Sequence, residues 1–165
     1  MSRIILGIDP GSRVTGYGII QVDDKRIRYV DSGCIRTESE NMYERLAVIF
    51  ENIKTLVEQY RPTEAAMEEV FVNANVQSAL KLGQARGSAV AAIATSRIPI
   101  EGYSPRQIKL AVVGYGNADK AQVQHMVKTL LALDKTPPSD AADALAAALC
   151  HSQTHASLER LNQAR

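Results

Sequence analysis

The chain has few of the residues that mark secreted, membrane-spanning or disulfide-stabilised proteins. Only Cys34 and Cys150 among its 165 residues are cysteine, too few for a disulfide framework and typical of a reducing compartment. No apolar run approaches the roughly 20 residues that span a bilayer. The segment Met1–Arg3 leads straight into a strand-like run, so no secretory leader is expected. We expect a cytoplasmic protein without membrane contact, with one domain at 1–153 and a flexible tail at 154–165.

Net charge is also nearly absent, at +1, but the charges are unevenly distributed. Residues 37–69 contain eight acids and three bases, whereas residues 81–128 contain seven bases and two acids. The basic part could supply contacts to phosphates without making the whole chain basic. Solvated helix faces of different sign explain the same pattern, and charge alone does not choose between them.

Hydrophobic periodicity predicts an α/β fold. A period of two residues indicates strands, and a period of 3.6 indicates helices. The expected strands are 4–9, 14–22, 26–36, 64–71 and 97–102, with a hairpin turn between the second and third. The expected helices are 41–60, 76–96, 104–132 with a break at 114–117, and one that starts after Ser139.

Four acidic residues stand on apolar elements, where a carboxylate is costly unless something compensates its charge. Asp9 ends the first strand, Glu68 lies in the fourth, and Asp140 and Asp143 share a face of the last helix. A hard divalent cation with oxygen ligands is a natural compensation, and it favours metal-assisted chemistry on phosphate. Ordinary roles also fit, because a turn aspartate can bond its own backbone and acids stabilise helix starts. Spacing does not choose between Glu68 and Glu69, which alternate along the strand.

Two further patterns have alternative explanations. His151 and His155 are four residues apart and could bind a metal, but no third ligand is near in sequence, and cationic side chains also suit a helix end. Small residues recur every four positions in the helix at 76–96, at Ala79, Gly83, Gly87 and Ala91. This stripe could pack tightly on the sheet or against a helix of a second subunit.

Three ordered motifs resemble the bacterial RuvC Holliday junction resolvases. They are Ile5–Gly18 with Asp9-Pro10-Gly11-Ser12, then Ser78–Gly87, then Asp140–Ala146, and Gln107–Lys109 and Val112–Gly114 lie between the last two in the expected order. The resemblance covers about residues 3 to 153. It implies a ribonuclease H-like fold with a five-stranded mixed sheet flanked by helices, and a homodimer that cuts two strands of a four-way DNA junction symmetrically.

The same resemblance assigns roles to single residues. It makes Asp9, Glu68, Asp140 and Asp143 the catalytic, metal-binding tetrad, which selects Glu68 over Glu69, and it places Lys109 and Lys120 beside the scissile DNA as catalytic candidates. It assigns base stacking at the crossover to Phe71 and dimerisation to the helix at 76–96. The DNA-binding candidates are Phe71, Asn75, Lys81, Arg86, Arg106, Lys109 and Lys120. Ala74 departs from the basic residue that relatives often carry there.

The expected reaction is hydrolysis with two Mg²⁺ ions per site, for which Mn²⁺ could substitute, leaving 5′-phosphate nicks that a ligase can close. RuvA and RuvB, the branch-migration proteins, are expected as partners because relatives have them. An actin-like phosphotransferase also begins with a motif like that around Asp9, but it needs two such domains and the chain is too short for both. A DNA-binding module without catalysis would leave the acids unexplained.

Overall fold

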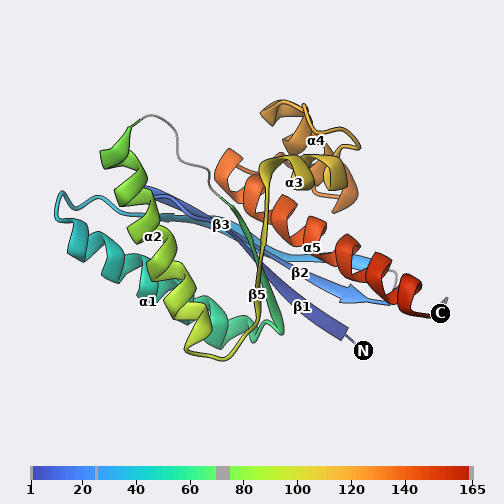
Figure 1. Cartoon of the computed structure of the whole chain (residues 1–165), viewed down its shortest axis with the longest axis horizontal. Helices are drawn as coiled ribbons and strands as arrows, with labels where there is room; N and C mark the ends of the chain where they lie inside the picture. The colour runs from blue at the N-terminus through green and yellow to red at the C-terminus, as the bar shows by residue number, and fades with distance from the viewer. Residues whose placement is uncertain (1, 25, 70–74, 164–165) are drawn as a thin grey trace.

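The protein forms a mixed five-stranded sheet with helices on both faces, as expected from the sequence (Figure 1). The structure is a computed structural model that describes residues 2–24, 26–69 and 75–163. The strands are β1 (Ser2–Asp9), β2 (Val14–Asp23), β3 (Arg26–Arg36), β4 (Glu64–Glu68) and β5 (Ile100–Tyr103), in the order β3-β2-β1-β4-β5. β1, β2 and β3 pair antiparallel, whereas β4 runs parallel to β1 and β5 parallel to β4.

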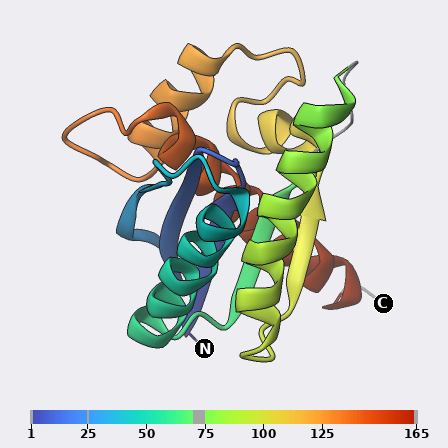
Figure 2. The ribbon, with the colours of Figure 1, turned by 90° about the vertical axis from the view of Figure 1, so that its left-hand side faces the viewer.

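Of the helices in the described residues, two pack on one face of the sheet and three on the other, and their arrangement can be followed in Figures 1 and 2. The first pair is α1 (Met42–Tyr60) and α2 (Val76–Ala94), and the second group is α3 (Pro105–Val112), α4 (Lys120–Leu130) and α5 (Ser139–Gln163). Each face therefore has its own hydrophobic core. Ile49 and Ile53 of α1 pack with Leu6 and Ile8 of β1 in the first.

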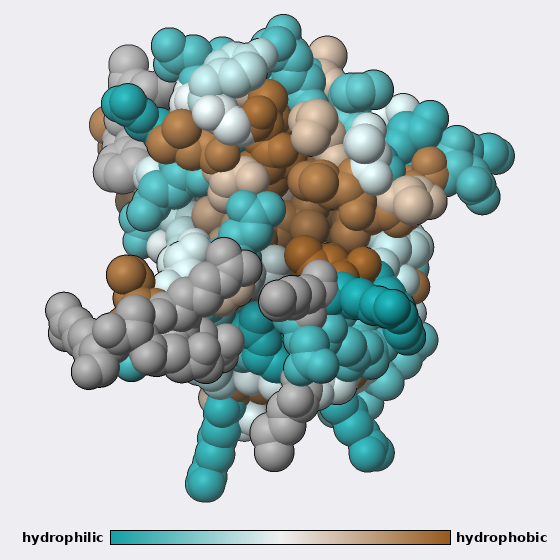
Figure 3. All heavy atoms as spheres, turned by 90° about the vertical axis from the view of Figure 1, so that its right-hand side faces the viewer, coloured by the Kyte–Doolittle hydropathy of each residue, from teal (hydrophilic) through white to brown (hydrophobic). Residues whose placement is uncertain are grey.

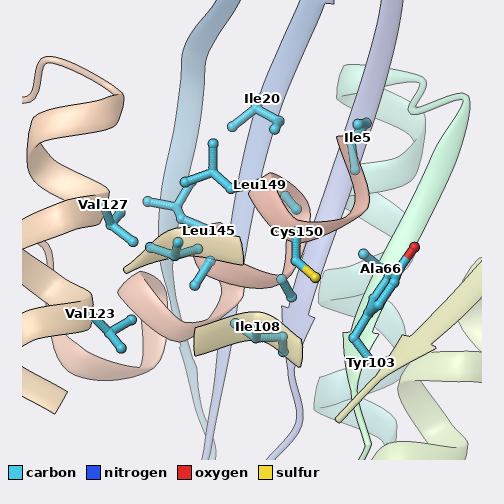
Figure 4. Close-up of a cluster of buried hydrophobic side chains, with 14 of the residues drawn as sticks. Ile5, Ile20, Ala66, Tyr103, Ile108, Val123, Val127, Leu145, Leu149 and Cys150 are labelled. Carbon is cyan, nitrogen blue, oxygen red and sulfur yellow. The ribbon is translucent and has the colours of Figure 1, made fainter. Parts of the chain in front are cut away.

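The second core lies under α5, whose Leu145 and Leu149 lie between the sheet and the residues Val123 and Val127 of α4 (Figure 4). Cys150 is buried there as a free thiol, where it packs as a small apolar side chain. In the view of Figure 3, hydrophobic side chains gather in the upper part of the surface and long polar side chains project below. The described helices include none that is both long and apolar enough to span a bilayer.

Local sequence explains where most elements begin and end. The side chain of Asn41 caps α1 by accepting from the backbone N–H of Tyr43 at 2.9 Å. α3 and α4 each begin with a capping box, formed by Ser104 with Gln107 and by Asp119 with Gln122. The predicted break between them includes Gly114, whose φ of 99° is a left-handed conformation that suits glycine.

Some predicted boundaries were wrong. β4 ends at Glu68 and not at residue 71; Glu69 follows it outside the strand, and residues 70–74 lie outside the described part of the chain. β5 begins at Ile100 and not at residue 97, because Arg97 has a φ of 57° and Pro99 has no N–H for a ladder bond. α5, of which the sequence predicted only the start, continues to Gln163.

Candidate active site

Asp9 and Glu68 lie side by side at the same edge of the sheet. Each is the last residue of its strand, and the parallel ladder pairs Ile8 of β1 with Met67 of β4 immediately before them. Carboxyl ends of neighbouring parallel strands commonly form binding sites, because the chain leaves the sheet there. Glu68 is partly buried, whereas Glu69 is exposed, with its side chain beside Gly102 at the β5 edge. The structure thus separates two glutamates that the sequence left equivalent.

Helix α5 brings Asp140 and Asp143 to this edge through contacts with glycines of the sheet. A Cβ atom on Gly16 would lie 2.0 Å from the carbonyl oxygen of Asp140, and one on Gly7 would lie 1.9 Å from that of Ala144. Gly16 is also the residue that pairs with Asp9 across β1 and β2. Backbone therefore packs directly on backbone, since any side chain at these glycines would push the first turns of α5 away.

The turn after Asp9 is fixed by three polar side chains. Arg45, buried in α1, donates from Nε and Nη2 to the carbonyl oxygen of Ser12 at 2.8 and 2.5 Å. The hydroxyl of Thr37 donates to the same oxygen at 2.8 Å, and the hydroxyl of Thr15 donates to the carbonyl oxygen of Gly11 at 2.9 Å. These bonds anchor the turn to α1 and to the residue that follows β3, so the strand end that carries Asp9 is held in place.

Burial and the repulsion of neighbouring carboxylates make Asp9, Glu68 and Asp143 hard to ionise. Burial, followed by the nearby carboxylates of Asp143, Glu68 and Asp140, raises the pKa of Asp9 to about 8. Burial, with a contribution from Asp143, also raises the pKa of Glu68. Burial raises the pKa of Asp143, although Lys120 acts in the opposite direction. The four acids that the sequence singled out therefore form one electrostatically coupled group, spread over β1, β4 and α5.

Two of the predicted lysines lie beside this group. Lys109, in the last turn of α3, and Lys120, the first residue of α4, both lower the pKa values of Glu68 and Asp143. A cation at a helix start opposes the helix dipole, so the place of Lys120 is better explained by the neighbouring acids than by helix stability. Glu68, Lys109 and Asp143 line a small pocket together with Pro105, Ile108 and Val123.

The other predicted DNA-binding residues are more scattered. Asn75 caps α2 by accepting from the N–H of Ser78, and Lys81 and Arg106 are exposed. Arg86 lies half-buried, with its Nε 3.4 Å from the sulfur of Met67, the residue before Glu68. Phe71, the stacking candidate, and Ala74 lie outside the described residues.

The small-residue stripe of α2 faces away from the sheet. Gly83, Gly87 and Ala91 are exposed and Ala79 is partly buried, whereas Ala85, Ala89 and Ala92 on the other side of the helix are fully buried. Among the described residues, and apart from the nearby backbone of α2 itself, no atom lies within 4 Å of where a Cβ on Gly83 or Gly87 would be. Packing on the sheet, one of the two interpretations left open by the sequence, is therefore excluded.

Sequence reasoning missed a third partner for the two histidines. Glu64, the first residue of β4, accepts a 2.6 Å hydrogen bond from Nε2 of His151 and lies 3.9 Å from Nε2 of His155. Glu64 lies 87 residues before His151 in the sequence, so no local pattern indicates this contact. A glutamate on a strand of alternating residues is also too common to predict it. Sequence reasoning also missed that Gly7 of β1 and Gly16 of β2 lie against the backbone of α5.

A mixed five-stranded sheet with acids from β1, β4 and a helix at one edge defines the class of ribonuclease H-like nucleases. A family model described as "Crossover junction endodeoxyribonuclease RuvC" matches residues 5–151, and the chain belongs to this family. A relative of that description from Marinobacter nauticus is 54% identical over 96% of this chain and 90% of its own length. One from Acinetobacter baumannii is 55% identical over 96% and 87%.

Solved structures agree with this assignment. The Thermus thermophilus RuvC structure in complex with a Holliday junction substrate superposes with a TM-score of 0.87 and 33% identity, over 93% of this chain and 94% of that one. The yeast mitochondrial Holliday junction resolvase Ydc2 matches at a TM-score of 0.70 and 16% identity, over 94% and 80%, and shows the shared fold alone. The resemblance to the resolvase family and the ribonuclease H-like fold expected from the sequence are confirmed.

Proposed function

We propose that the chain is an endonuclease that resolves four-way DNA junctions by paired, symmetric phosphodiester hydrolysis, in recombination and repair. The observation that carries the proposal is the convergence of Asp9, Glu68, Asp140 and Asp143 at one edge of the sheet, with the pKa of Asp9 raised to about 8. Membership of the RuvC family, and the junction named with the Thermus thermophilus structure, supply the substrate.

The acidic group fits a divalent metal requirement, which this nuclease family implies. All four ligands would be carboxylates, which hard cations prefer, and their repulsion would be relieved by positive charge between them. We propose that Asp9, Glu68, Asp140 and Asp143 hold two Mg²⁺ ions, for which Mn²⁺ can substitute. When bound, these ions supply an activated water and stabilise the leaving 3′ oxygen.

The chain's own residues position the DNA and balance its charge. Lys109 and Lys120 lie next to Glu68 and Asp143, so they would place positive charge beside the scissile phosphate. Arg86 lies beside β4, and Asn75, Lys81 and Arg106 would contact the DNA backbone further out. Phe71 follows β4 in sequence, and we propose that it stacks on a base exposed at the crossover. The products would be nicks with 5′-phosphates.

A homodimer formed through α2 would deliver the paired cuts. Exposed Val76, Leu80, Gly83 and Gly87 give one side of this helix an apolar surface that another copy could cover. A twofold axis places two identical sites on two symmetry-related strands. We also propose a cytoplasmic enzyme that works with RuvA and RuvB, in which residues 1–153 form the nuclease domain and residues 154–165 a tail.

Cleavage of a synthetic four-way junction in Mg²⁺ tests the proposal. The wild-type protein should cut two opposed strands, and Asp143→Asn should bind the junction without cutting it. Asp134→Asn, the same change at an exposed site, should cut normally. An actin-like phosphotransferase would transfer phosphate from ATP and leave the junction intact, and a DNA-binding module would bind it with or without Mg²⁺. Cutting by Asp143→Asn at the wild-type rate would remove Asp143 from the site.

A further inference from the structure

A second cluster of metal-ligand side chains lies at the opposite end of β4 from Glu68. It consists of Glu64, the first residue of that strand, with His151 and His155 one helical turn apart on α5. Glu68 follows Glu64 by four positions along the strand, which corresponds to roughly 13 Å. The acids of the proposed active site and this cluster therefore do not share ligands.

We infer that Glu64, His151 and His155 bind one divalent transition-metal ion, for which Zn²⁺ is the best match. One ligand atom from each residue lies within 4.8 Å of the other two. Two imidazoles and one carboxylate form a common zinc ligand set, whereas Mg²⁺ prefers oxygen ligands alone. The donor chemistry thus distinguishes this site from the all-carboxylate group at the other end of the strand.

The distances between the three residues are close to those of a tetrahedral site. Bonds of about 2.1 Å to a tetrahedral ion place neighbouring ligand atoms roughly 3.4 Å apart. Nε2 of His155 lies 3.9 Å from Oε2 of Glu64, and its side chain is 41% exposed, so a small rotation closes the gap. Nε2 of His151 lies 2.6 Å from the same oxygen in a hydrogen bond that the ion would replace. The exposed side of His155 leaves room for a water ligand.

Tyr103 supports His151 as a ligand. Its hydroxyl forms a 2.7 Å hydrogen bond with Nδ1 of His151, a histidine that is 2% exposed. Metal-binding histidines usually donate their second ring N–H to such a partner, which fixes the tautomer and the ring orientation. With the ion bound, Nδ1–H would donate to the tyrosine oxygen and Nε2 would be free of its proton. Without the ion, Nε2–H donates to Glu64 and the hydroxyl of Tyr103 donates to Nδ1. Metal binding therefore requires only that the ring proton of His151 move from Nε2 to Nδ1.

Arg3 competes for the same carboxylate. Its Nη1 lies 3.4 Å from Oε2 of Glu64, so three partners meet at one oxygen. Arg3 and Glu64 are the charged groups that face His151. The centroid of the His155 ring lies 4.7 Å from the centroid of the His151 ring. A bound dication would require the arginine, whose side chain is 22% exposed, to turn toward solvent. Removing the Arg3 charge should therefore strengthen metal binding. If Glu64 and the two histidines served only to pair with Arg3, the same change would only lower the stability of the protein.

Co²⁺ binding to the tag-free, full-length protein tests the inference, because tetrahedral Co²⁺ absorbs visible light and Zn²⁺ displaces it. Excess Mg²⁺ in the buffer keeps the carboxylate site occupied. We expect one Co²⁺ per chain. His155→Ala should lower the affinity by more than 100-fold, Tyr103→Phe should lower it by about 10- to 100-fold, and Arg3→Gln should raise it. His125→Ala, at an exposed histidine outside the cluster, should change nothing.

Two outcomes would overturn the inference: no visible absorption at any Co²⁺ concentration, or equal affinity in His155→Ala and wild type. Junction cleavage by His155→Ala separates this site from the proposed function. The variant should cut at the wild-type rate in Mg²⁺, because the contacts of His155 with Glu64 and His151 lie at the end of β4 opposite Glu68. Loss of Co²⁺ binding with cleavage retained supports the metal site, and a wild-type protein that binds Co²⁺ but never cuts would refute only the nuclease proposal.

Discussion

The raised pKa of Asp9 predicts that the metal-free protein loses stability as the pH rises. The unfolded chain releases the Asp9 proton near its ordinary pKa of 3.8, whereas the folded protein keeps it up to about pH 8. Between these values the folded state binds one more proton than the unfolded state, so the free energy of unfolding falls with increasing pH. Above the folded-state pKa the loss is complete. Asp9→Asn carries no such proton and should escape this part of the pH dependence.

The size of the effect follows from the shift. One pH unit corresponds to about 1.4 kcal/mol for one group, so the full shift of the Asp9 pKa is worth roughly 6 kcal/mol. Because its side chain is only partly buried, solvent screening should reduce this to about 3 kcal/mol. For a chain of this length that corresponds to roughly 6–12 °C in melting temperature. Most of it should develop between about pH 5 and about pH 8.

Thermal unfolding followed by circular dichroism in EDTA measures this difference. Above about pH 8, Asp9→Asn should melt at the higher temperature, and the gap should narrow toward about pH 5. Asp134→Asn makes the same chemical change at an exposed aspartate and should follow the wild type throughout. Mg²⁺ should stabilise the wild type more than Asp9→Asn. If wild type and Asp9→Asn lose stability in parallel as the pH rises, the electrostatic account of the site is wrong.

Three other substitutions test the packing, the dimer and the stacking residue. Gly16→Ala should move the first turn of α5 away from β2, lowering stability by about 1–3 kcal/mol and the cleavage rate by about 100-fold; Gly83→Ala, where a Cβ meets open space, should not destabilise the chain in thermal unfolding. A Cβ on Gly87 meets open space among the described residues, so a change from dimer to monomer for Gly87→Leu in light scattering would locate the interface on α2. Gly87→Ala should stay dimeric, and a dimeric Gly87→Leu would place the interface elsewhere. Phe71→Ala should reduce junction cleavage more than duplex binding, with little change in melting temperature, and a large drop in melting temperature would assign the ring to the core.

Much of the fold could be read from the sequence because periodicity and local turn chemistry carry it. The alternation in β2, the helical spacing in α1 and the break at Gly114 are local signals, and each element formed where it was expected. The ends of β4 and β5 were harder. They depend on Pro99 and on the pairing of the two strands, which the apolar runs do not record.

The candidate site was predictable in its residues and not in its packing. Acids on apolar elements are visible in a sequence because their cost demands an explanation. The choice of Glu68 over Glu69 needed the family resemblance, and in the structure Glu68 lies with the other acids. Contacts between distant segments left no such sign: Glu64 meets His151 across 87 residues, and Gly16 lies against the backbone of Asp140.

The glycine contacts under α5 have a consequence for how this enzyme family can vary. Where Gly7 and Gly16 meet the backbone of α5, the gap between sheet and helix is set by the radii of main-chain atoms. Such atoms are the same in every protein, so exchanging one apolar side chain for another in either core would alter stability while leaving the spacing between β1 and the start of α5 unchanged. Substitutions in the two cores can therefore accumulate without changing the distances between the four acids. A redesigned protein could replace Leu145 or Leu149 but would have to keep Gly7 and Gly16.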